Sequence, residues 1–157
     1  MIIPKKYLRI LSTYFALIIY STFSLASEIN HAKPDSFVVL PNSTVYKLEL
    51  ARTQEERILG LMFREKLANG KGMLFIFPQD GFHPFYMKNT LIPLDIIWLD
   101  SNYRIVYFHI NVQPCKEEPC ESYYPIAKSR FVLEFNTGTV VKEKLKIGDK
   151  LKVTIVQ

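Results

Sequence analysis

The sequence predicts a compact α+β domain, a mainly antiparallel, barrel-like β structure with one or two short helices. Three observations lead to this class. About seven apolar segments of strand length follow residue 43, and most are joined by short turns, which favour antiparallel pairing. Few segments have a helical pattern, too few for the crossovers of a parallel doubly wound sheet. Hydrophobic residues make up 48% of the 157-residue chain, which is ample for a packed core.

The first 26 residues differ from the rest of the chain. A basic start with Lys5, Lys6 and Arg9 precedes a mostly apolar stretch, and Ser24–Ala26 offers small residues at a cleavage point. This pattern is typical of a secretory signal peptide. We therefore expect residues 1–26 to be removed and the mature protein to be exported, either periplasmic or secreted. An uncleaved N-terminal anchor is the alternative, although the apolar stretch is short for a membrane span.

Much of the positive charge of the chain resides in this leader. The whole sequence has 20 Lys and Arg residues against 15 Asp and Glu residues, a net charge of +5. Removing residues 1–26 takes away three basic residues and no acidic ones, which leaves 17 basic and 15 acidic groups, a net charge of +2. Because the remaining basic residues are scattered, we expect no nucleic-acid partner. We also expect a monomer with no stable membrane span after cleavage.

The first elements of the mature chain follow from its turn residues and caps. Prolines and polar residues punctuate residues 27–43, which we interpret as a linker or an edge segment. A single globular β-rich domain is predicted over residues 44–157, and its first strand over 44–51. Thr53 and Glu56 then form a capping box, in which each side chain bonds to the backbone amide of the other residue. A helix of about two to three turns is expected directly after Thr53.

The remaining elements follow from apolar runs and the turns between them. Strands are expected over residues 73–77, 85–87, 94–99, 104–112, 130–135 and 151–155, and one or two helical turns over 138–145. The third and fourth of these strands flank a polar turn and are expected to form a hairpin. In the fifth strand, Val132 and Glu134 are expected to face away from Phe131, Leu133 and Phe135, because side chains alternate along a strand.

The mature chain contains two cysteines, Cys115 and Cys120. An exported protein meets an oxidising compartment, so a disulfide that closes this short loop is the leading interpretation. The spacing excludes a CxxC redox pair. A metal site is the weaker alternative, because two thiols without a second pair are a weak metal motif.

Four ordered motifs are the most distinctive feature of the sequence. They are Arg57-x-x-Gly60-Leu61-Met62-x-Arg64, Gly72-Met-Leu-Phe75-x-Phe77, Phe85-Tyr-Met-Lys-Asn-Thr90 and Ile92-Pro-Leu-Asp95. Their order resembles the domain-of-unknown-function family 192, over residues 44–156. One departure is Tyr86, where the family often has Trp. The resemblance implies a small exported bacterial protein of compact β-rich fold, and no reaction or ligand comes with it.

Five polar residues are candidates for ligand binding: Arg57, Arg64, Lys88, Asn89 and Thr90. On a continuous helix the two arginines would share one face and could grip a carboxylate or phosphate group. The other three lie between two apolar strands, where they could form the floor of a polar pocket. The competing interpretation is structural: the arginines form ion pairs, and Asn89 sits in a left-handed turn.

Asp95 and Glu134 are weak candidates for catalysis, since paired carboxylates perform acid–base chemistry in glycoside hydrolysis. Asp95 lies in a strongly apolar strand, so its charge needs a partner, for which Arg57 or Lys88 is expected. No P-loop, nucleophile elbow or HExxH motif occurs. We expect no cofactor and no metal.

These observations favour an exported binding domain over an enzyme. The predicted function is the binding of a small polar or anionic ligand, or of a partner, through a polar pocket. A carboxylate-dependent hydrolase built on Asp95 and Glu134 is one alternative. A non-catalytic structural component of the cell envelope is the other. A pocket lined by the five polar residues would favour the first, and complete internal pairing of those groups would favour the last.

Overall fold

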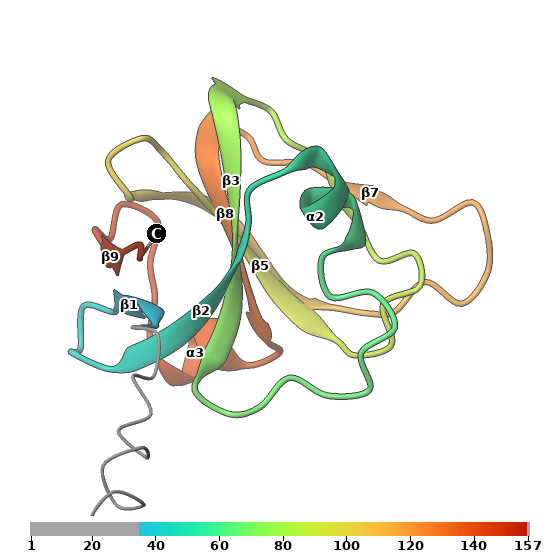
Figure 1. Ribbon diagram of the computed structural model, residues 1–157, viewed down its shortest axis with the longest axis horizontal. Helices are drawn as coiled ribbons and strands as arrows, with labels where there is room; N and C mark the ends of the chain where they lie inside the picture. The colour runs from blue at the N-terminus through green and yellow to red at the C-terminus, as the bar shows by residue number, and fades with distance from the viewer. Residues whose placement is uncertain (1–34, 157) are drawn as a thin grey trace, which may run out of the picture. The chain divides into compact units, whose positions relative to one another are not determined.

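The computed structural model describes residues 35–156, which are mostly β structure with two short helices (Figure 1). The strands are β1 (Ser36–Val39), β2 (Val45–Ala51), β3 (Lys71–Gly81), β4 (Phe85–Tyr86), β5 (Leu94–Leu99), β6 (Ile105–Val112), β7 (Ser122–Tyr123), β8 (Ser129–Asn136) and β9 (Lys152–Thr154). The helices are α2 (Gln54–Leu59) and α3 (Thr139–Lys142). The predicted signal peptide lies outside the described residues.

Seven strands form one open sheet in the order β6-β5-β8-β3-β2-β1-β9, and β4 pairs with β7 in a separate two-stranded ribbon. Neighbouring strands of the large sheet are antiparallel except β2 and β3, which run parallel. The mainly antiparallel prediction is confirmed in this coarser form. The parallel pairing of β2 and β3 is made possible by the long connection through α2, because parallel neighbours need a crossover.

The expected barrel-like closure is wrong, because the two margins of the sheet, β6 and β9, are not paired strands. An isolated antiparallel bridge between Arg104 and Lys150 and a few backbone hydrogen bonds between residues 103–105 and 148–151 join the segments next to these strands. β9 has three residues, all of which are placed opposite β1. A strand this short leaves the curled sheet open.

The segment expected to be a linker or an edge contains β1, which lies inside the sheet. Phe37, Val38 and Val39 pair with β2 on one side and with β9 on the other. Val38 is fully buried and Leu40 nearly so. The folded domain therefore begins before residue 44, and the apolar run is a core strand.

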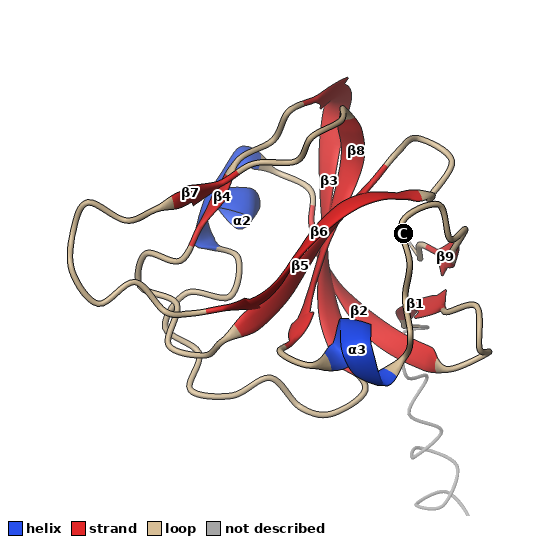
Figure 2. Cartoon of the chain, turned by 180° about the vertical axis from the view of Figure 1, so that it is seen from behind, coloured by secondary structure: helices blue, strands red, loops and turns tan. Residues whose placement is uncertain are grey.

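The large sheet buries a hydrophobic core on each face. Along β8, Leu133 and Phe135 belong to the core shared with α3, and Val132 belongs to the other. This confirms the alternation predicted for β8. α2 and the β4–β7 ribbon lie on one side of the sheet and α3 on the other (Figures 1 and 2).

Gly72 on β3 permits a close approach between β3 and β8, where it is paired with Phe135. A Cβ atom at position 72 would overlap the Phe135 ring and would lie 2.9 Å from the carbonyl oxygen of Glu134. Any larger residue would therefore force the two strands apart, next to the position of Glu134.

α2 begins where the capping box predicted it. The Thr53 Oγ1 accepts a hydrogen bond from the Glu56 amide at 3.1 Å, and the Glu56 carboxylate accepts one from the Thr53 amide at 2.9 Å. The helix ends before Gly60, which has a positive φ of 45°. None of its six residues is buried. This helix is held by its cap and by a few contacts, not by a buried apolar face.

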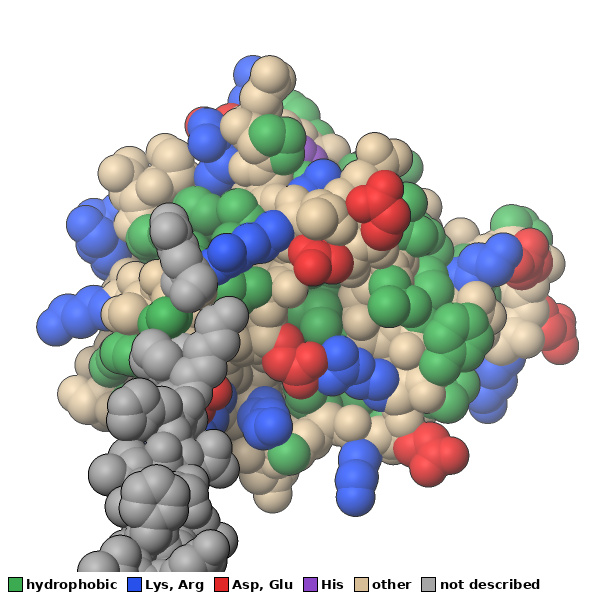
Figure 3. All heavy atoms as spheres, in the orientation of Figure 1, with side chains coloured by type: hydrophobic (Ala, Val, Ile, Leu, Met, Phe, Trp, Pro, Cys, Tyr) green, Lys and Arg blue, Asp and Glu red, His purple; other side chains and the backbone are tan. Residues whose placement is uncertain are grey.

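Charged side chains of both signs are interspersed over the face of the molecule shown in Figure 3. Hydrophobic side chains gather on the right-hand part of the same view. No helix within residues 35–156 has the length and apolar character needed to cross a membrane.

Candidate ligand pocket

A cavity of about 220 Å³ lies between α2 and the main sheet. Its walls come from α2 and the loop after it, from β3, from β4, from Thr90 and from Glu134 on β8. The parallel crossover creates this space, because it carries α2 over the face of β3 and β8. The side chains that matter for the chemistry are Arg57, Phe75, Phe77, Phe85, Thr90 and Glu134.

The walls of the cavity are largely apolar, and aromatic rings form part of them. Phe75 and Phe77 come from β3, and Phe85 from β4. The rings of Phe75 and Phe85 meet edge to face with their centroids 4.9 Å apart. Such rings favour contact with apolar or aromatic groups.

Glu134 is a buried acidic group in the cavity wall. The residue is only 5% exposed, and its Oε2 has no hydrogen-bond partner within residues 35–156. Burial raises the pKa of Glu134 to about 8, although the positive charge of Arg64 acts in the opposite direction. The carboxyl group is therefore mostly protonated at neutral pH, and it can donate as well as accept a hydrogen bond.

Arg57 forms part of the wall on the α2 side. Its Nη1 donates to the carbonyl oxygens of Arg52 and Ile76, the latter at 3.0 Å. The guanidinium carbon lies 5.2 Å from the centroid of the Phe77 ring, a cation–π contact. Nε and Nη2 have no acceptor among the described residues. Arg57 thus links α2 to β3 through Nη1, and its Nε and Nη2 donors make no hydrogen bond within residues 35–156.

Arg64 lies apart from Arg57. α2 ends at Leu59, so the two arginines do not share a helical face. Arg64 forms a bidentate pair with Glu49, with Nη to Oε distances of 2.8 and 2.7 Å. Arg64 therefore forms an ion pair within the fold, as the structural interpretation predicted, but its partner is Glu49 and not Asp95 or Glu134.

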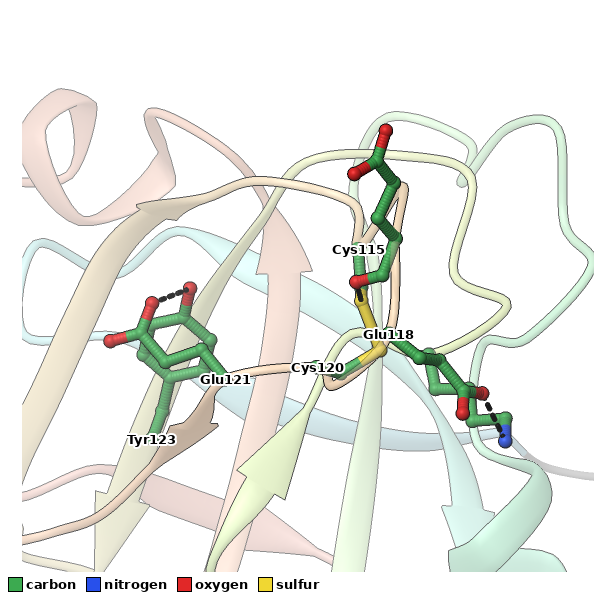
Figure 4. The surroundings of a disulfide bond; sticks show 7 residues. Cys115, Glu118, Cys120, Glu121 and Tyr123 are labelled. Carbon is green, nitrogen blue, oxygen red and sulfur yellow. Dashed lines mark hydrogen bonds and ion pairs between the residues drawn. A yellow bond between two sulfur atoms is a disulfide. The ribbon is translucent and has the colours of Figure 1, made fainter.

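The segment Lys88–Thr90 forms a turn with one residue facing the cavity. The Lys88 ammonium pairs with Glu118 at 2.5 Å in an exposed position (Figure 4). Asn89 has a left-handed φ of 56°, and its carbonyl oxygen accepts a hydrogen bond from the Phe63 amide at 2.8 Å. Thr90 is buried and lines the cavity. Of the five ligand-binding candidates, the cavity wall includes Arg57 and Thr90, and not Arg64, Lys88 or Asn89.

Asp95 is fully buried and is satisfied by backbone amides. Its Oδ1 accepts from the Asn111 amide at 2.9 Å, and its Oδ2 accepts from the Val140 amide at 2.8 Å. The expectation of Arg57 or Lys88 as its partner is wrong. Because Val140 lies in the first turn of α3, Asp95 serves as a cap for that helix.

Asp95 and Glu134 face opposite sides of the main sheet. Asp95 is paired with Phe135 across β5 and β8, whereas Glu134 is paired with Ile96. Paired residues share a face, and Phe135 and Ile96 belong to different cores. The sheet therefore separates the two carboxylates, so they have no common cleft.

The cysteine loop and the histidines lie away from the Glu134 carboxyl. Cys115 and Cys120 are at bonding distance, with their sulfur atoms 2.10 Å apart (Figure 4). His83 stacks on Phe77, and His109 meets the Trp98 ring edge to face. Within the part of the chain that the structure describes, no group of three His, Cys, Asp or Glu side chains is placed to hold a metal ion.

Sequence reasoning did not find the cavity as such. It placed the phenylalanines in strands and considered Glu134 as a catalytic partner of Asp95 or as an ion-pair partner of an arginine. One indication was available in the segment Phe131–Phe135, where a single acidic residue interrupts an apolar strand. A buried carboxyl group there needs either an internal partner or an open space beside it.

An open, mixed β sheet with one crossover helix packed over one face defines a small β-rich domain. The chain belongs to the DUF192 family, described as "Uncharacterized ACR", whose family model matches residues 37–153. This confirms the family resemblance and extends it to include β1.

The chain is also similar to individual proteins from three organisms. A UPF0127 protein from Pyrococcus horikoshii is 32% identical over 111 residues, which cover 68% of this chain and 86% of that protein. A crystal structure of a protein of unknown function from Novosphingobium aromaticivorans matches with a TM-score of 0.68 and 34% identity, over 75% of this chain and 83% of the other. A Sinorhizobium meliloti protein described as a "putative transcription regulator" matches with a TM-score of 0.66 and 31% identity, over 81% and 98%.

Proposed function

We propose that this protein binds a small polar or anionic organic ligand in the cavity between α2 and the main sheet. One observation carries the proposal: the Glu134 Oε2 is buried and unpaired in the described structure, and Glu134 lines a cavity. Buried polar atoms in native proteins almost always have a hydrogen-bond partner, because leaving one unsatisfied costs about 1–3 kcal/mol. A bound ligand would supply that partner.

The size and the lining of the cavity support a ligand larger than water. At about 220 Å³ the cavity exceeds the space that a single water molecule needs, roughly 10–15 Å³. Its walls combine aromatic rings with Arg57, Thr90 and Glu134, the pattern of mostly apolar lining and few polar groups that ligand sites share.

The two alternative functions have less support. A hydrolase built on Asp95 and Glu134 needs both carboxylates in one cleft, and the strand register places them on opposite faces. A purely structural component would be expected to pair its buried polar groups internally. Asp95 meets that expectation, and the Oε2 of Glu134 does not.

The cavity is tested by NMR titration of the isotope-labelled protein with a panel of small organic acids, amines, amides and alcohols. Binding at the proposed site would shift the amide signals of Gly60, Phe75 and Glu134. Met62→Trp places a larger side chain in the cavity wall and should abolish those shifts, whereas Lys88→Met, a change outside the wall, should leave them intact. Shifts confined to other surfaces, or unchanged in Met62→Trp, would refute the proposal.

We further propose that the protein is exported and acts in the periplasm or outside the cell. The leader anatomy of residues 1–26 and the cysteine pair at bonding distance support this placement. N-terminal sequencing of the exported fraction should give a mature chain beginning near Ser27. Intact mass after alkylation should show two free thiols only once the protein has been reduced. An intact Met1 in the membrane pellet would contradict export.

A further inference from the structure

We infer that the rim of the cavity is a docking surface for another protein, and that the docked segment is an extended chain with a large apolar residue next to an acidic one. Five exposed hydrophobic side chains form this rim surface: Ile58, Leu59, Phe63, Tyr86 and Leu91. The rim surface differs from the proposed ligand site, because it faces solvent around the cavity and needs no ligand inside it.

Three of the five side chains belong to the cavity wall and also face solvent. Ile58 and Leu59 come from the end of α2 and Tyr86 from β4, and their exposed fractions lie between 42% and 56%. Figure 3 shows hydrophobic side chains gathered in the region where Figure 1 places α2 and the loop after it. Soluble monomers rarely expose large contiguous apolar patches, and such patches mark interaction sites.

Phe63 and Leu91 extend the rim surface beyond the cavity. Phe63 directly follows the wall residue Met62, and Leu91 directly follows the wall residue Thr90. The Phe63 amide donates to the Asn89 carbonyl oxygen at 2.8 Å, so the two segments lie side by side. The Phe63 and Leu91 side chains are 64% and 54% exposed, and neither is part of the two hydrophobic cores of the described domain. A small molecule inside the cavity would leave them uncovered, whereas a protein segment lying across the rim would cover them.

Phe63 also has an unfavourable backbone conformation. Its φ is 62°, in the left-handed region that bulky side chains rarely adopt. Asn or Gly would adopt this conformation with less strain, and a polar side chain would be better suited to an exposed position. Strained residues of this kind concentrate at functional sites, and aromatic side chains are enriched at protein interfaces. We therefore assign Phe63 as the principal anchor for the partner.

The charge of Arg57 specifies the residue that the partner places beside its apolar group. Arg57 uses Nη1 to reach the carbonyl oxygens of Arg52 and Ile76, and it forms no ion pair within residues 35–156. Glu56, its neighbour on α2, is occupied by the helix cap. Nε and Nη2 share one edge of the guanidinium, and such an edge can bind a carboxylate through two parallel hydrogen bonds. An Asp or Glu side chain of the partner complements this edge.

β4 favours a partner segment in an extended conformation. It pairs with β7 on one side, and no other described strand pairs with it. Backbone groups of successive strand residues point to opposite edges, so either Phe85 or Tyr86 presents its N–H and C=O groups to the unpaired edge. Both residues line the cavity that α2 also lines. An extended segment between α2 and β4 could add backbone hydrogen bonds at this edge, as in the recognition of peptides by strand addition.

The experiment selects linear peptides from a random phage library on the immobilised wild-type protein. We expect the enriched sequences to pair a large apolar residue with an adjacent Asp or Glu. The most enriched peptide is then synthesised, and its affinity for the protein in solution is measured by fluorescence anisotropy. The same peptide with its acidic residue replaced by the corresponding amide should bind about tenfold more weakly, because it loses a charge-assisted pair with Arg57.

Phe63→Asn separates recognition from folding. Asparagine suits the left-handed conformation and the exposed position, so the midpoint of urea denaturation should be unchanged or higher. Binding of the selected peptide should weaken by about tenfold or more, because the aromatic anchor is lost. The matched control is Val141→Asn, which removes a 67% exposed apolar side chain from α3, on the other side of the sheet (Figures 1 and 2), and should bind the peptide as the wild type does. A lower denaturation midpoint with unchanged peptide affinity in Phe63→Asn would show that Phe63 only holds the fold together.

Three further results would overturn the inferred partner. Selection of no sequence, or of sequences without an acidic residue, would reject an acidic extended segment. Concentration-dependent dimers in analytical ultracentrifugation that Phe63→Asn abolishes would assign the rim surface to a second copy of the chain. Flotation of the wild type, but not of Phe63→Asn, with vesicles of phosphatidylethanolamine and phosphatidylglycerol would assign it to a membrane. None of these results decides whether small molecules bind in the cavity, which the NMR panel tests separately.

Discussion

Asp95 and Glu134 are buried carboxyl groups on adjacent strands of one sheet, and their surroundings differ completely. Both oxygens of Asp95 accept hydrogen bonds from backbone amides, at 2.9 and 2.8 Å. The Oε2 of Glu134 has no partner within residues 35–156, and Glu134 borders a cavity. The hydrogen bonds of Asp95 connect α3 and the end of β6 to β5, whereas the Oε2 of Glu134 makes no such connection among the described residues.

The difference shows that burial alone does not identify a functional carboxyl group. A buried acid whose hydrogen bonds are all made within the chain stabilises the fold. A buried acid with an oxygen that has no hydrogen-bond partner lowers stability, and its position in the wall of a cavity supports the ligand binding proposed above. This contrast can be tested by changing each side of it in turn.

The largest effect is expected for Asp95→Ala, which removes the acceptor from two backbone amides at once. The bond to the Val140 amide is buried and the bond to the Asn111 amide is partly buried. A buried amide left without a partner costs about 1–3 kcal/mol, so we expect a total loss of about 3 kcal/mol in the free energy of unfolding. Urea denaturation measures this loss. Asp95→Asn keeps one acceptor oxygen and should lose less. A cost below about 1 kcal/mol for the alanine variant would show that Asp95 is not the structural member of the pair.

Glu134 should make the free energy of unfolding fall as pH rises. Its pKa is about 8 in the folded protein against an ordinary 4.5, so the folded state holds the proton over a range in which the unfolded state has lost it. The free energy of unfolding should therefore fall by about 2 kcal/mol between pH 6.0 and pH 7.5 relative to Glu134→Gln, which cannot titrate. Parallel urea melts of the two proteins at several pH values give the difference. Parallel curves would mean that Glu134 has an ordinary pKa and a partner.

Arg64→Met sharpens the comparison through a neighbouring charge. The positive charge of Arg64 lowers the pKa of Glu134, so its removal should raise that pKa further. A carbon NMR titration of the Glu134 carboxyl measures the shift. The variant also loses the partly exposed pair with Glu49, at a cost of about 1 kcal/mol or less. A lowered Glu134 pKa would show that Arg64 acts through packing instead of charge.

The smallest effect on folding is expected for Lys88→Met. The ammonium and its partner Glu118 are both exposed, and methionine keeps the bulk of the side chain. The midpoint of urea denaturation should not change measurably, which makes this variant the control for the other three. A clear loss of stability would mean that the turn after β4 depends on the Lys88–Glu118 pair.

Sequence reasoning reached the strands, the capping box of α2 and the two-faced pattern of β8, because each depends on residues close together in the chain. Thr53 and Glu56 specify the start of α2 through their own backbone amides. The hairpin of β5 and β6 follows from the polar turn between them. Such features need no knowledge of which distant segments meet.

The rest depended on long-range pairing that no local pattern encodes. The register of β5 against β8, which puts Asp95 and Glu134 on opposite faces, is set by strands about 35 residues apart in the chain. The partner of Arg64 is Glu49 in β2, which precedes α2 in the chain, whereas Arg64 follows α2. The cavity exists because β2 and β3 are parallel, whereas the short links between strands had predicted a mainly antiparallel sheet and did not locate this parallel pair.

No side chain of α2 is buried, so packing constrains this helix much less than it constrains the strands of the sheet. Ile58 and Leu59 both line the cavity and are 56% and 55% exposed, so their replacement removes nothing from either core. The side chains at these positions of α2 can therefore be exchanged with little loss of stability, unlike the buried side chains of the sheet. A library that randomises positions 54, 58 and 59 while retaining Thr53, Glu56 and Arg57 would therefore reshape the lining of the cavity without changing either hydrophobic core.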